Sequence, residues 1–513
     1  MKIIEVSYNQ INKFSKLVVD YVNEDKNIKP FINHFPTLEN FEKQISEKQN
    51  HEINRSILVE VLKEQNASFS LSEKSKININ LLLSEDTFTI TTGHQLCLFT
   101  GPLYFIYKII SAINLSQQLK DKYPTKTFVP IFWMATEDHD FKEINHIHLF
   151  GKKIVWNSKQ EGAVGRMKLD GFDEVITALK LLLGESENAQ KLIVLFKNAY
   201  LKHDNLADAT RYLVNKLFGK YGLVILDGDN KKLKKQFIPI IKKDILESGF
   251  VNTIKESSEY LAKDYKAQAF VRDINFFKLS EKKRELIKGE VSENEIKENP
   301  EKFSPNVLIR PLYQETILPN IATIGGAAEV SYWMQLKTAF KQEEIPFPIL
   351  VLRNSAIIIS KNKFQKFTNL GFTIEDIFLQ EAQLHKQYVL SQVSSEISLE
   401  KEKKELEKLF SKLLNKTTDK SLQSTIKAEQ QKQLNSLQKL EEKLLKSEKK
   451  KHETALQQIS KLKAMLFPNN SLQERFDNFI PYYLNGGENF IEILKEELNP
   501  LAPNFAILSP QKK

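Results

Sequence analysis

Four ionisable side chains follow one another in residues 137–140, within the polar segment Ala-Thr-Glu-Asp-His-Asp-Phe-Lys-Glu-Ile-Asn-His of residues 135–146. The segment follows residues 127–134, a continuous apolar run typical of a buried parallel strand. Ligands of open α/β sheets bind outside the carboxyl ends of the strands. Asp138, His139 and Asp140 are therefore candidate catalytic residues, able to bind an ammonium group or to move a proton. The alternative is that one of the aspartates only caps the next helix.

A second polar turn follows another predicted strand. Residues 87–92 are rich in β-branched and aromatic types, and the turn Gly93-His94-Gln95 comes directly after them. Pro102 suits the first turn of a helix that we expect to reach about residue 120. The N-terminus of that helix would favour a phosphate or carboxylate near His94 and Thr100. The turn supplies the candidate catalytic residues His94 and Gln95, and the candidate substrate- or nucleotide-binding residues Thr92, Gly93 and Thr100.

Three later segments also place polar residues after apolar runs. Residues 307–309 predict a strand that delivers Arg310 to a loop, where its guanidinium can bind a carboxylate or phosphate, although a surface ion pair is the alternative. Paired glycines precede a predicted helix over 330–340, and Glu329 there either caps the helix or holds an amine. The last core strand, 346–352, ends at Arg353. Further candidate binding residues are therefore Asn145, Arg310, Tyr313, Gln314, Gly325, Gly326, Glu329 and Arg353, with Asp227 and Asp229 as second candidates after another apolar strand.

Composition limits the class of protein. Of 513 residues, 41% are hydrophobic, so a large core is possible, and the single cysteine excludes an intramolecular disulfide. The net charge of +9 arises from 74 basic and 65 acidic residues that are interspersed, without an aromatic-basic platform, so we expect no nucleic-acid partner. No apolar window of membrane-spanning length and no signal peptide are present, which predicts a cytoplasmic protein without a membrane partner.

The spacing of apolar residues predicts an α/β fold with four parts. Residues 1–86 are expected to form a helical cap and 87–385 a parallel-sheet core, in which Pro130 indicates a bulge or an unpaired position. Leucines at three-four spacing in 386–466 predict an antiparallel coiled-coil hairpin, and 467–513 a tail that docks on the core. The long leucine seam predicts a homodimer formed through the hairpin.

Several motifs carry a resemblance to a known family. They are Thr92-Gly-His-Gln, Phe99-Thr-Gly-Pro-Leu-Tyr, Phe132-Trp-Met-Ala-Thr-Glu-Asp-His-Asp-Phe, Arg310-Pro-Leu-Tyr-Gln-Glu and Ile324-Gly-Gly. Over essentially its whole length the chain resembles the bacillithiol biosynthesis cysteine-adding enzymes. The resemblance implies a Rossmann-like core similar to nucleotidyltransferase-type ligases, and a ligase that adds cysteine to malyl-glucosamine. By the same analogy, ATP would activate the carboxylate, with Mg²⁺ possible only alongside the nucleotide.

Two other functions compete with the ligase. A metal-dependent hydrolase could use His94, the 138–140 cluster, His146 and His148, because imidazole and carboxylate groups make such sites. However, no His-Glu-x-x-His motif or comparable spacing is present, and we expect no resident metal. A coiled-coil scaffold with a degenerate core is the third possibility, and the polar residues at several strand ends argue against it.

Overall fold

The computed structural model describes residues 2–392 and 398–509, which form two compact units. The first unit contains Met1–Ile357 and Gln473–Leu508, and the second contains Ile358–Leu472. The second unit begins well before residue 386, where the coiled-coil segment was expected to start. The reason is that α18 (Lys361–Asn369) and α19 (Glu381–Gln392) both pack against α22 (Glu453–Leu466).

The main sheet of the first unit is Rossmann-like, with five parallel strands in the order β11-β10-β2-β3-β6. Within this sheet, the first strand in sequence is the central strand β2. The next two, β3 and β6, lie on one side of it, and the last two, β10 and β11, lie on the other side. The strand order therefore reverses between β2 and β10, and ligands of such sheets bind at that point, outside the carboxyl ends. The strands are β2 (Thr87–His94), β3 (Thr127–Met134), β6 (Val224–Asp227), β10 (Asn320–Gly325) and β11 (Ile349–Leu352).

Pro130 lies inside β3 without a bulge. Its register with β2 is continuous, since Ile90 pairs with Pro130 and Thr91 with Ile131. Pairing with β6 begins only at Ile131. The missing N–H of Pro130 is thus tolerated because this position lies outside the part of β3 that pairs with β6.

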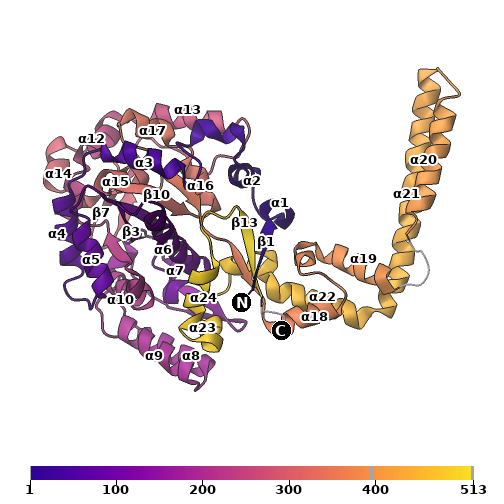
Figure 1. The fold of residues 1–513 in the computed structure, drawn as a ribbon. Coiled ribbons are helices and arrows are strands. Elements are labelled where there is room, and N and C mark those ends of the chain that lie inside the picture. The colour runs from indigo at the N-terminus through magenta and orange to yellow at the C-terminus, as the bar shows by residue number, and fades with distance from the viewer. Residues whose placement is uncertain (1, 393–397, 510–513) are drawn as a thin grey trace. The chain divides into compact units, whose positions relative to one another are not determined.

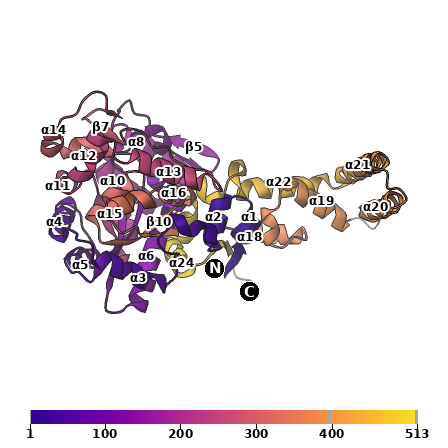
Figure 2. The ribbon, with the colours of Figure 1, turned by 90° about the horizontal axis from the view of Figure 1, so that it is seen from above.

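Helices surround the sheet, as Figures 1 and 2 show. Leu115 and Leu119 of α6 (Tyr104–Lys122) pack with Phe88 and Ile90 in one core cluster. A second cluster joins alternate residues of β3 to α4 and α15, because successive strand side chains point to opposite faces. The other helices of the first unit include α2 (Lys16–Val22), α3 (Asn40–Gln49), α4 (Arg55–Gln65), α5 (Glu73–Leu81), α8 (Phe172–Leu183), α9 (Glu187–Tyr200), α10 (Leu206–Phe218), α12 (Ile238–Glu247), α13 (Val251–Leu261), α17 (Lys337–Gln342), α23 (Ile480–Gly486) and α24 (Asn489–Glu497).

Two predictions about local structure are wrong. Lys2–Ser7, expected to belong to a helical cap, forms strand β1 beside β13 (Asn504–Ser509), a pairing between chain ends that local periodicity cannot reveal. Residues 307–309 form no strand. Instead, β9 (Phe303–Pro305) is followed by helix α15 (Arg310–Ile317), which starts with Pro311 in its first turn, so Arg310 lies on a helix and not in a loop.

The second unit contains a helical hairpin. Helices α20 (Glu400–Leu414) and α21 (Lys420–Lys451) lie side by side in Figures 1 and 2 and pack together, with a short turn between them. Helix α21 ends at Lys451, with His452 as its C-cap residue, and α22 begins at Glu453. Residues 393–397 of the predicted hairpin lie outside the described residues. No helix in the described part of the chain is long and apolar enough to cross a membrane.

Candidate active site

A cavity of about 570 Å³ opens at the carboxyl ends of β2, β3 and β10, where the strand order reverses. Its wall combines residues 93–95, where β2 ends, with residues 133–138, where β3 ends. The predicted turn at Gly93-His94-Gln95 is thus still strand as far as His94, and we call these three residues the turn after β2. The start of α16 (Ala327–Trp333), which follows β10, closes another side. Arginines from β8 (Arg284–Leu286), from α15 and from the segment before α23 complete the wall. This is the place that the topology of a parallel sheet predicts for a ligand.

The turn after β2 meets the polar segment after β3. The Gln95 amide donates hydrogen bonds to Asp138 Oδ2, at 2.7 Å, and to Glu143 Oε2, at 2.8 Å. The other oxygen of Asp138 accepts the backbone N–H of His139 at 2.7 Å. These bonds fix the Asp138 carboxylate on the cavity wall. Two of the predicted segments, residues 93–95 and the segment that contains Asp138, thus meet through the Gln95–Asp138 hydrogen bond.

A buried ion pair joins the turn after β2 to the helix after β10. Lys108, on α6, donates to the Gly93 carbonyl at 2.7 Å and pairs with Glu329. Glu329 in turn accepts the Gly326 N–H at 2.8 Å and so caps α16. Burial alone would raise the pKa of Glu329, but the Lys108 ammonium outweighs it and the pKa lies below its ordinary value. The Gly326 N–H is therefore used by the protein and does not face a ligand.

His94 is a neutral imidazole. Burial, followed by the nearby Lys108 ammonium, lowers the pKa of His94 to about 3. Its Nδ1 lies 2.9 Å from the Gln95 carbonyl, which can only accept, so Nδ1 carries the hydrogen and Nε2 is the basic nitrogen. The ring packs against Tyr104 and Phe105. His94 can thus accept a hydrogen bond at Nε2, while its lowered pKa makes it a weak base.

Three arginines on the cavity wall form no ion pair with any carboxylate of the described residues: Arg284, Arg310 and Arg475. Arg310 lies over Trp133 and Trp333, with its guanidinium carbon 5.7 and 6.0 Å from the ring centres. By contrast, Arg353 is buried and pairs with Glu474 at 2.8 Å. Guanidinium groups that have no carboxylate partner suit an anionic ligand, although Arg284 already donates to Ser304 and to the Pro305 carbonyl.

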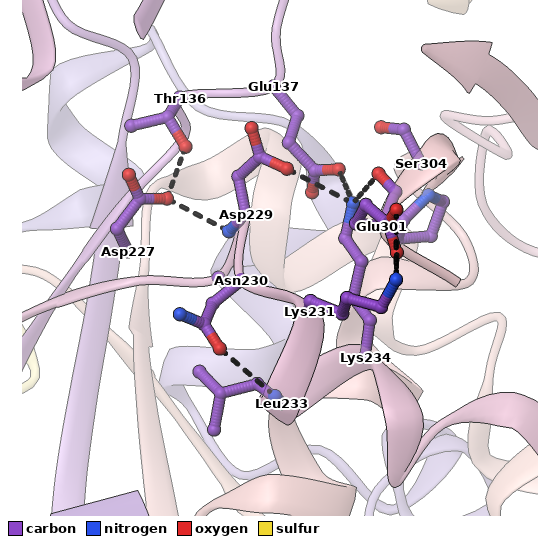
Figure 3. A network of polar contacts seen from close by, with 12 residues as sticks. Thr136, Glu137, Asp227, Asp229, Asn230, Lys231, Leu233, Lys234, Glu301 and Ser304 are labelled. Carbon is purple, nitrogen blue, oxygen red and sulfur yellow. Dashed lines mark hydrogen bonds and ion pairs between the residues drawn. The ribbon is translucent and has the colours of Figure 1, made fainter. Parts of the chain in front are cut away.

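An ionic network lies behind the end of β3 (Figure 3). Lys234, on α11 (Lys231–Lys235), pairs with Glu137 and lies 3.3 Å from Asp229 Oδ1. Arg166 binds the other oxygen of Asp229 at 2.6 Å. Nearby, Thr136 donates to Asp227, whose pKa is raised to about 6 by burial and by the charge of Asp229. Of the Glu137–Lys234–Asp229–Arg166 network, only Glu137 lines the cavity.

Comparison with known proteins decides the family. Residues 1–354 match the family model described as bacillithiol biosynthesis BshC, N-terminal Rossmann-like domain, and residues 356–510 match the C-terminal coiled-coil domain of the same family. The chain belongs to the BshC family. Relatives named "Putative cysteine ligase BshC" include those of Flavobacterium psychrophilum, at 47% identity over 98% of both chains, and Flavobacterium johnsoniae, at 45% identity over 98% of this chain and 99% of the relative. The relative of that name in Bacillus cytotoxicus is 26% identical over 93% of this chain. The predicted resemblance is confirmed.

Half of the site residues predicted in this BshC chain lie on the cavity wall. They are Gly93, His94, Gln95, Asp138, Arg310, Gly326, Glu329 and Arg353.

The other predicted residues lie outside that wall, and several have structural partners. Thr92 donates to the Ile324 carbonyl within the sheet, and Tyr313 donates to the Gly228 carbonyl. Gln314 donates to Thr323. His139 is 47% exposed and its ring contacts Arg284. Thr100 is buried, and Asp140 is exposed just before α7 (Phe141–Ile144). The Asn145 amide donates to the Trp156 carbonyl, and Gly325 is the last residue of β10.

The predicted anion site at the start of α6 is wrong. The Leu103 N–H there donates to the Asp477 carbonyl at 2.7 Å, and Asn478 binds the carbonyls of Phe99 and Gly101. A segment from the far end of the chain thus covers this helix end, which sequence spacing could not show. The described residues contain no group of three or more His, Cys, Asp or Glu side chains that could hold a metal ion.

Four charged residues of the cavity wall escaped prediction: Lys108, Glu137, Arg284 and Arg475. Lys108 carried a usable signal, since it is the only charged residue in the apolar run 103–115. Glu137 lay inside the polar segment but was not singled out. The two arginines had no local signal, because their positions depend on how distant segments fold back onto the sheet.

Proposed function

We propose that this chain is a ligase that joins the carboxylate of L-cysteine to the amine of malyl-glucosamine, forming an amide bond in bacillithiol biosynthesis. Membership of the BshC family carries the proposal, because full-length relatives are named as cysteine ligases. The cavity supports it, since about 570 Å³ falls within the range of roughly 300–1,000 Å³ usual for small-molecule sites.

The charges of the wall suit both substrates. Asp138, held by Gln95, offers a fixed carboxylate for the cysteine ammonium. Arg310 and Arg475 offer guanidinium groups for the carboxylates of the malyl group. Neutral His94 offers Nε2 as a hydrogen-bond acceptor. Ligands that carry both an ammonium and carboxylates therefore find opposite charges within one cavity.

A free carboxylate is a poor acyl donor, so the reaction requires activation, and we propose ATP as the activator. The cationic side chains fit a phosphate group, since Arg310 and Arg475 line the cavity without a carboxylate partner among the described residues. The start of α16 does not fit, because Glu329 already accepts its N–H. Phosphate binding would therefore rest on side chains, with Lys108 contributing charge from the wall.

The direct test is product formation by the purified full chain. Incubation with L-cysteine, malyl-glucosamine, ATP and Mg²⁺ should give a product whose mass equals the two substrates less one water. Omitting ATP should abolish it. Hydrolysis of the amide product without any synthesis under these conditions would favour the hydrolase, and metal analysis of the same preparation would then identify a bound ion.

We also propose a homodimer formed through the α20–α21 hairpin. Leu409, Leu422, Leu440 and Leu444 are each about half exposed there, so an apolar stripe lacks cover within the described residues. Light scattering of the full chain should give twice the monomer mass, and Leu440→Lys with Leu444→Lys should give a monomer. Leu181→Lys, at a leucine of α8 that is 82% exposed and lies outside the hairpin, is the control. A monomeric wild type would contradict the dimer.

A further inference from the structure

Of the four carboxylate oxygens in the ionic network of Glu137, Lys234, Asp229 and Arg166, three accept a bond from Lys234 or Arg166 and one does not. The Lys234 ammonium has three N–H donors and three acceptors: Glu137 Oε1, Asp229 Oδ1 at 3.3 Å and the Glu301 carbonyl at 3.1 Å. Lys234 is only 1% exposed. It therefore has no donor left for a ligand.

Both oxygens of Asp229 also have a cationic partner. Its Oδ1 faces Lys234, and its Oδ2 accepts two bonds from Arg166, at 3.0 Å from Nε and 2.6 Å from Nη2. Two cations and two carboxylates balance within this group. Glu137 is the member whose second oxygen, Oε2, has no hydrogen-bond partner among the described residues. Glu137 is also a residue of the cavity wall, and 14% of its side chain is exposed. The network thus fixes one carboxylate oxygen and leaves the other without a partner at a residue that lines the cavity.

We infer that Glu137 is the catalytic base of the ligase reaction, and that Lys234 is its positioning residue. The inference rests on the proposed function. In the step concerned, the lone pair of the neutral amine forms the new C–N bond to the acyl carbon of cysteine. That carbon is activated as a mixed anhydride with a phosphate group from a nucleoside triphosphate. The C–O bond to phosphate breaks and phosphate leaves with its electron pair. The surplus N–H proton moves to Glu137 Oε2 and then to solvent.

The neighbouring groups favour Glu137 over the other candidates for this role. Both oxygens of Asp138 already accept hydrogen bonds, Oδ1 from the His139 backbone N–H and Oδ2 from Gln95. Asp138 therefore suits binding of the cysteine ammonium better than proton transfer. His139 lies outside the cavity wall against Arg284. The pKa of Glu137 is raised, chiefly by burial and further by the negative charge of Asp229. The Lys234 ammonium opposes this rise but does not cancel it. A carboxylate whose pKa is raised towards neutrality is a better base.

The charged and titratable groups that face Glu137 come from several elements. Lys234 and Asp229 face it from α11 and the loop before that helix, and Arg284 faces it from β8. The buried Tyr313 hydroxyl faces it from α15. Of these, Lys234 contributes the strongest lowering of the Glu137 pKa. Loss of Lys234 should therefore raise this pKa.

The experiment measures steady-state kinetics of the full chain with L-cysteine, malyl-glucosamine and ATP across pH. Glu137→Gln keeps the shape of the side chain and should lower kcat by about 100- to 10,000-fold with little change in KM. Lys234→Met should lower kcat and move its acidic limb to higher pH, a change that loss of folded enzyme cannot produce. Lys235→Met, at the exposed neighbouring position on α11, should match the wild type.

The outcomes separate the assignment from the proposed function. Absence of product from the wild type refutes the proposed function, and the assignment with it. An active wild type with kcat of Glu137→Gln within about tenfold overturns only the assignment. If the acidic limb of the kcat–pH profile does not move in Lys234→Met, Lys234 is not the positioning residue. If His139→Ala lowers kcat more than Glu137→Gln does, His139 and not Glu137 is the base.

Discussion

Replacing Lys108 tests the contact that joins the two halves of the sheet. The Lys108–Glu329 pair connects the turn after β2 to the helix after β10, across the point where the strand order reverses. Lys108→Met keeps the length and the apolar stem but removes the charge. We expect a clear loss of stability in the first unit, because Glu329 is left without its counterion and the Gly93 carbonyl without its donor.

The magnitude follows from burial. Removing one partner of a fully buried ion pair costs about 3–5 kcal/mol. Here Lys108 is 5% exposed, but Glu329 is 29% exposed on the cavity and keeps its bond from Gly326. Water can therefore solvate the remaining carboxylate, and about 2 kcal/mol is a better expectation. Losing the donor to Gly93 adds about 1 kcal/mol, which gives a total near 3 kcal/mol.

Urea unfolding followed by tryptophan fluorescence is a suitable assay. All three tryptophans, Trp133, Trp156 and Trp333, are buried in the first unit, so their emission reports on that unit alone. A double-mutant cycle with Glu329→Gln isolates the pair.

The coupling free energy from this double-mutant cycle decides whether the Lys108–Glu329 pair behaves as a buried one. The double variant should recover part of the loss, because no unpaired charge remains, and the coupling should reach about 2 kcal/mol. A coupling below about 0.5 kcal/mol would refute the reasoning, since the pair would then behave like an exposed one.

Three further predictions concern single side chains. Asp138→Asn should raise the KM for cysteine more than it lowers kcat, because it removes charge and keeps shape; an unchanged KM would contradict ammonium binding. Cys97→Ala should keep most activity, because burial raises the pKa of this thiol to about 12 and the proposed route needs no enzyme nucleophile; abolished turnover in folded protein would indicate a thioester. The pKa of Asp227 is about 6 in the fold against an ordinary 3.8, so the native state binds the extra proton in that window. The free energy of unfolding should therefore fall by up to about 3 kcal/mol as pH rises from 3.8 to 6, and Asp227→Asn should remove that slope.

Sequence patterns predicted the core of the fold because its signals are local. Strands β2 and β3 are continuous apolar or β-branched runs, and α6 follows a proline at the position where helices begin. Helix α10 starts directly after Asn205, whose side chain caps it as expected for this residue type. The strand β1 was missed because its partner, β13, lies at the other end of the chain.

The clearest part of the site prediction concerns residues that follow a strand directly. Gly93, His94 and Gln95 end one strand and Asp138 follows the next, so their proximity comes from parallel pairing alone. Arg475 and Glu474 reach the same region from a segment more than a hundred residues beyond β11, after the whole second unit. No spacing rule relates them to the sheet, because their approach depends on tertiary packing.

The polar segment after β3 shows why residue type alone could not assign roles. Inside a strand, successive side chains alternate between faces, but that rule ends with the strand. Thr136 turns to Asp227, Glu137 to Lys234 and the cavity, and Asp138 to Gln95, while His139 lies outward against Arg284. In sequence the three ionisable groups at 137–139 are equivalent candidates. What separates them is which atoms their partners leave free, and only Glu137 combines a place on the cavity wall with an oxygen that has no hydrogen-bond partner in the described structure. The choice of base is therefore decided by the distant residues Lys234 and Asp229, through the bonds that they make.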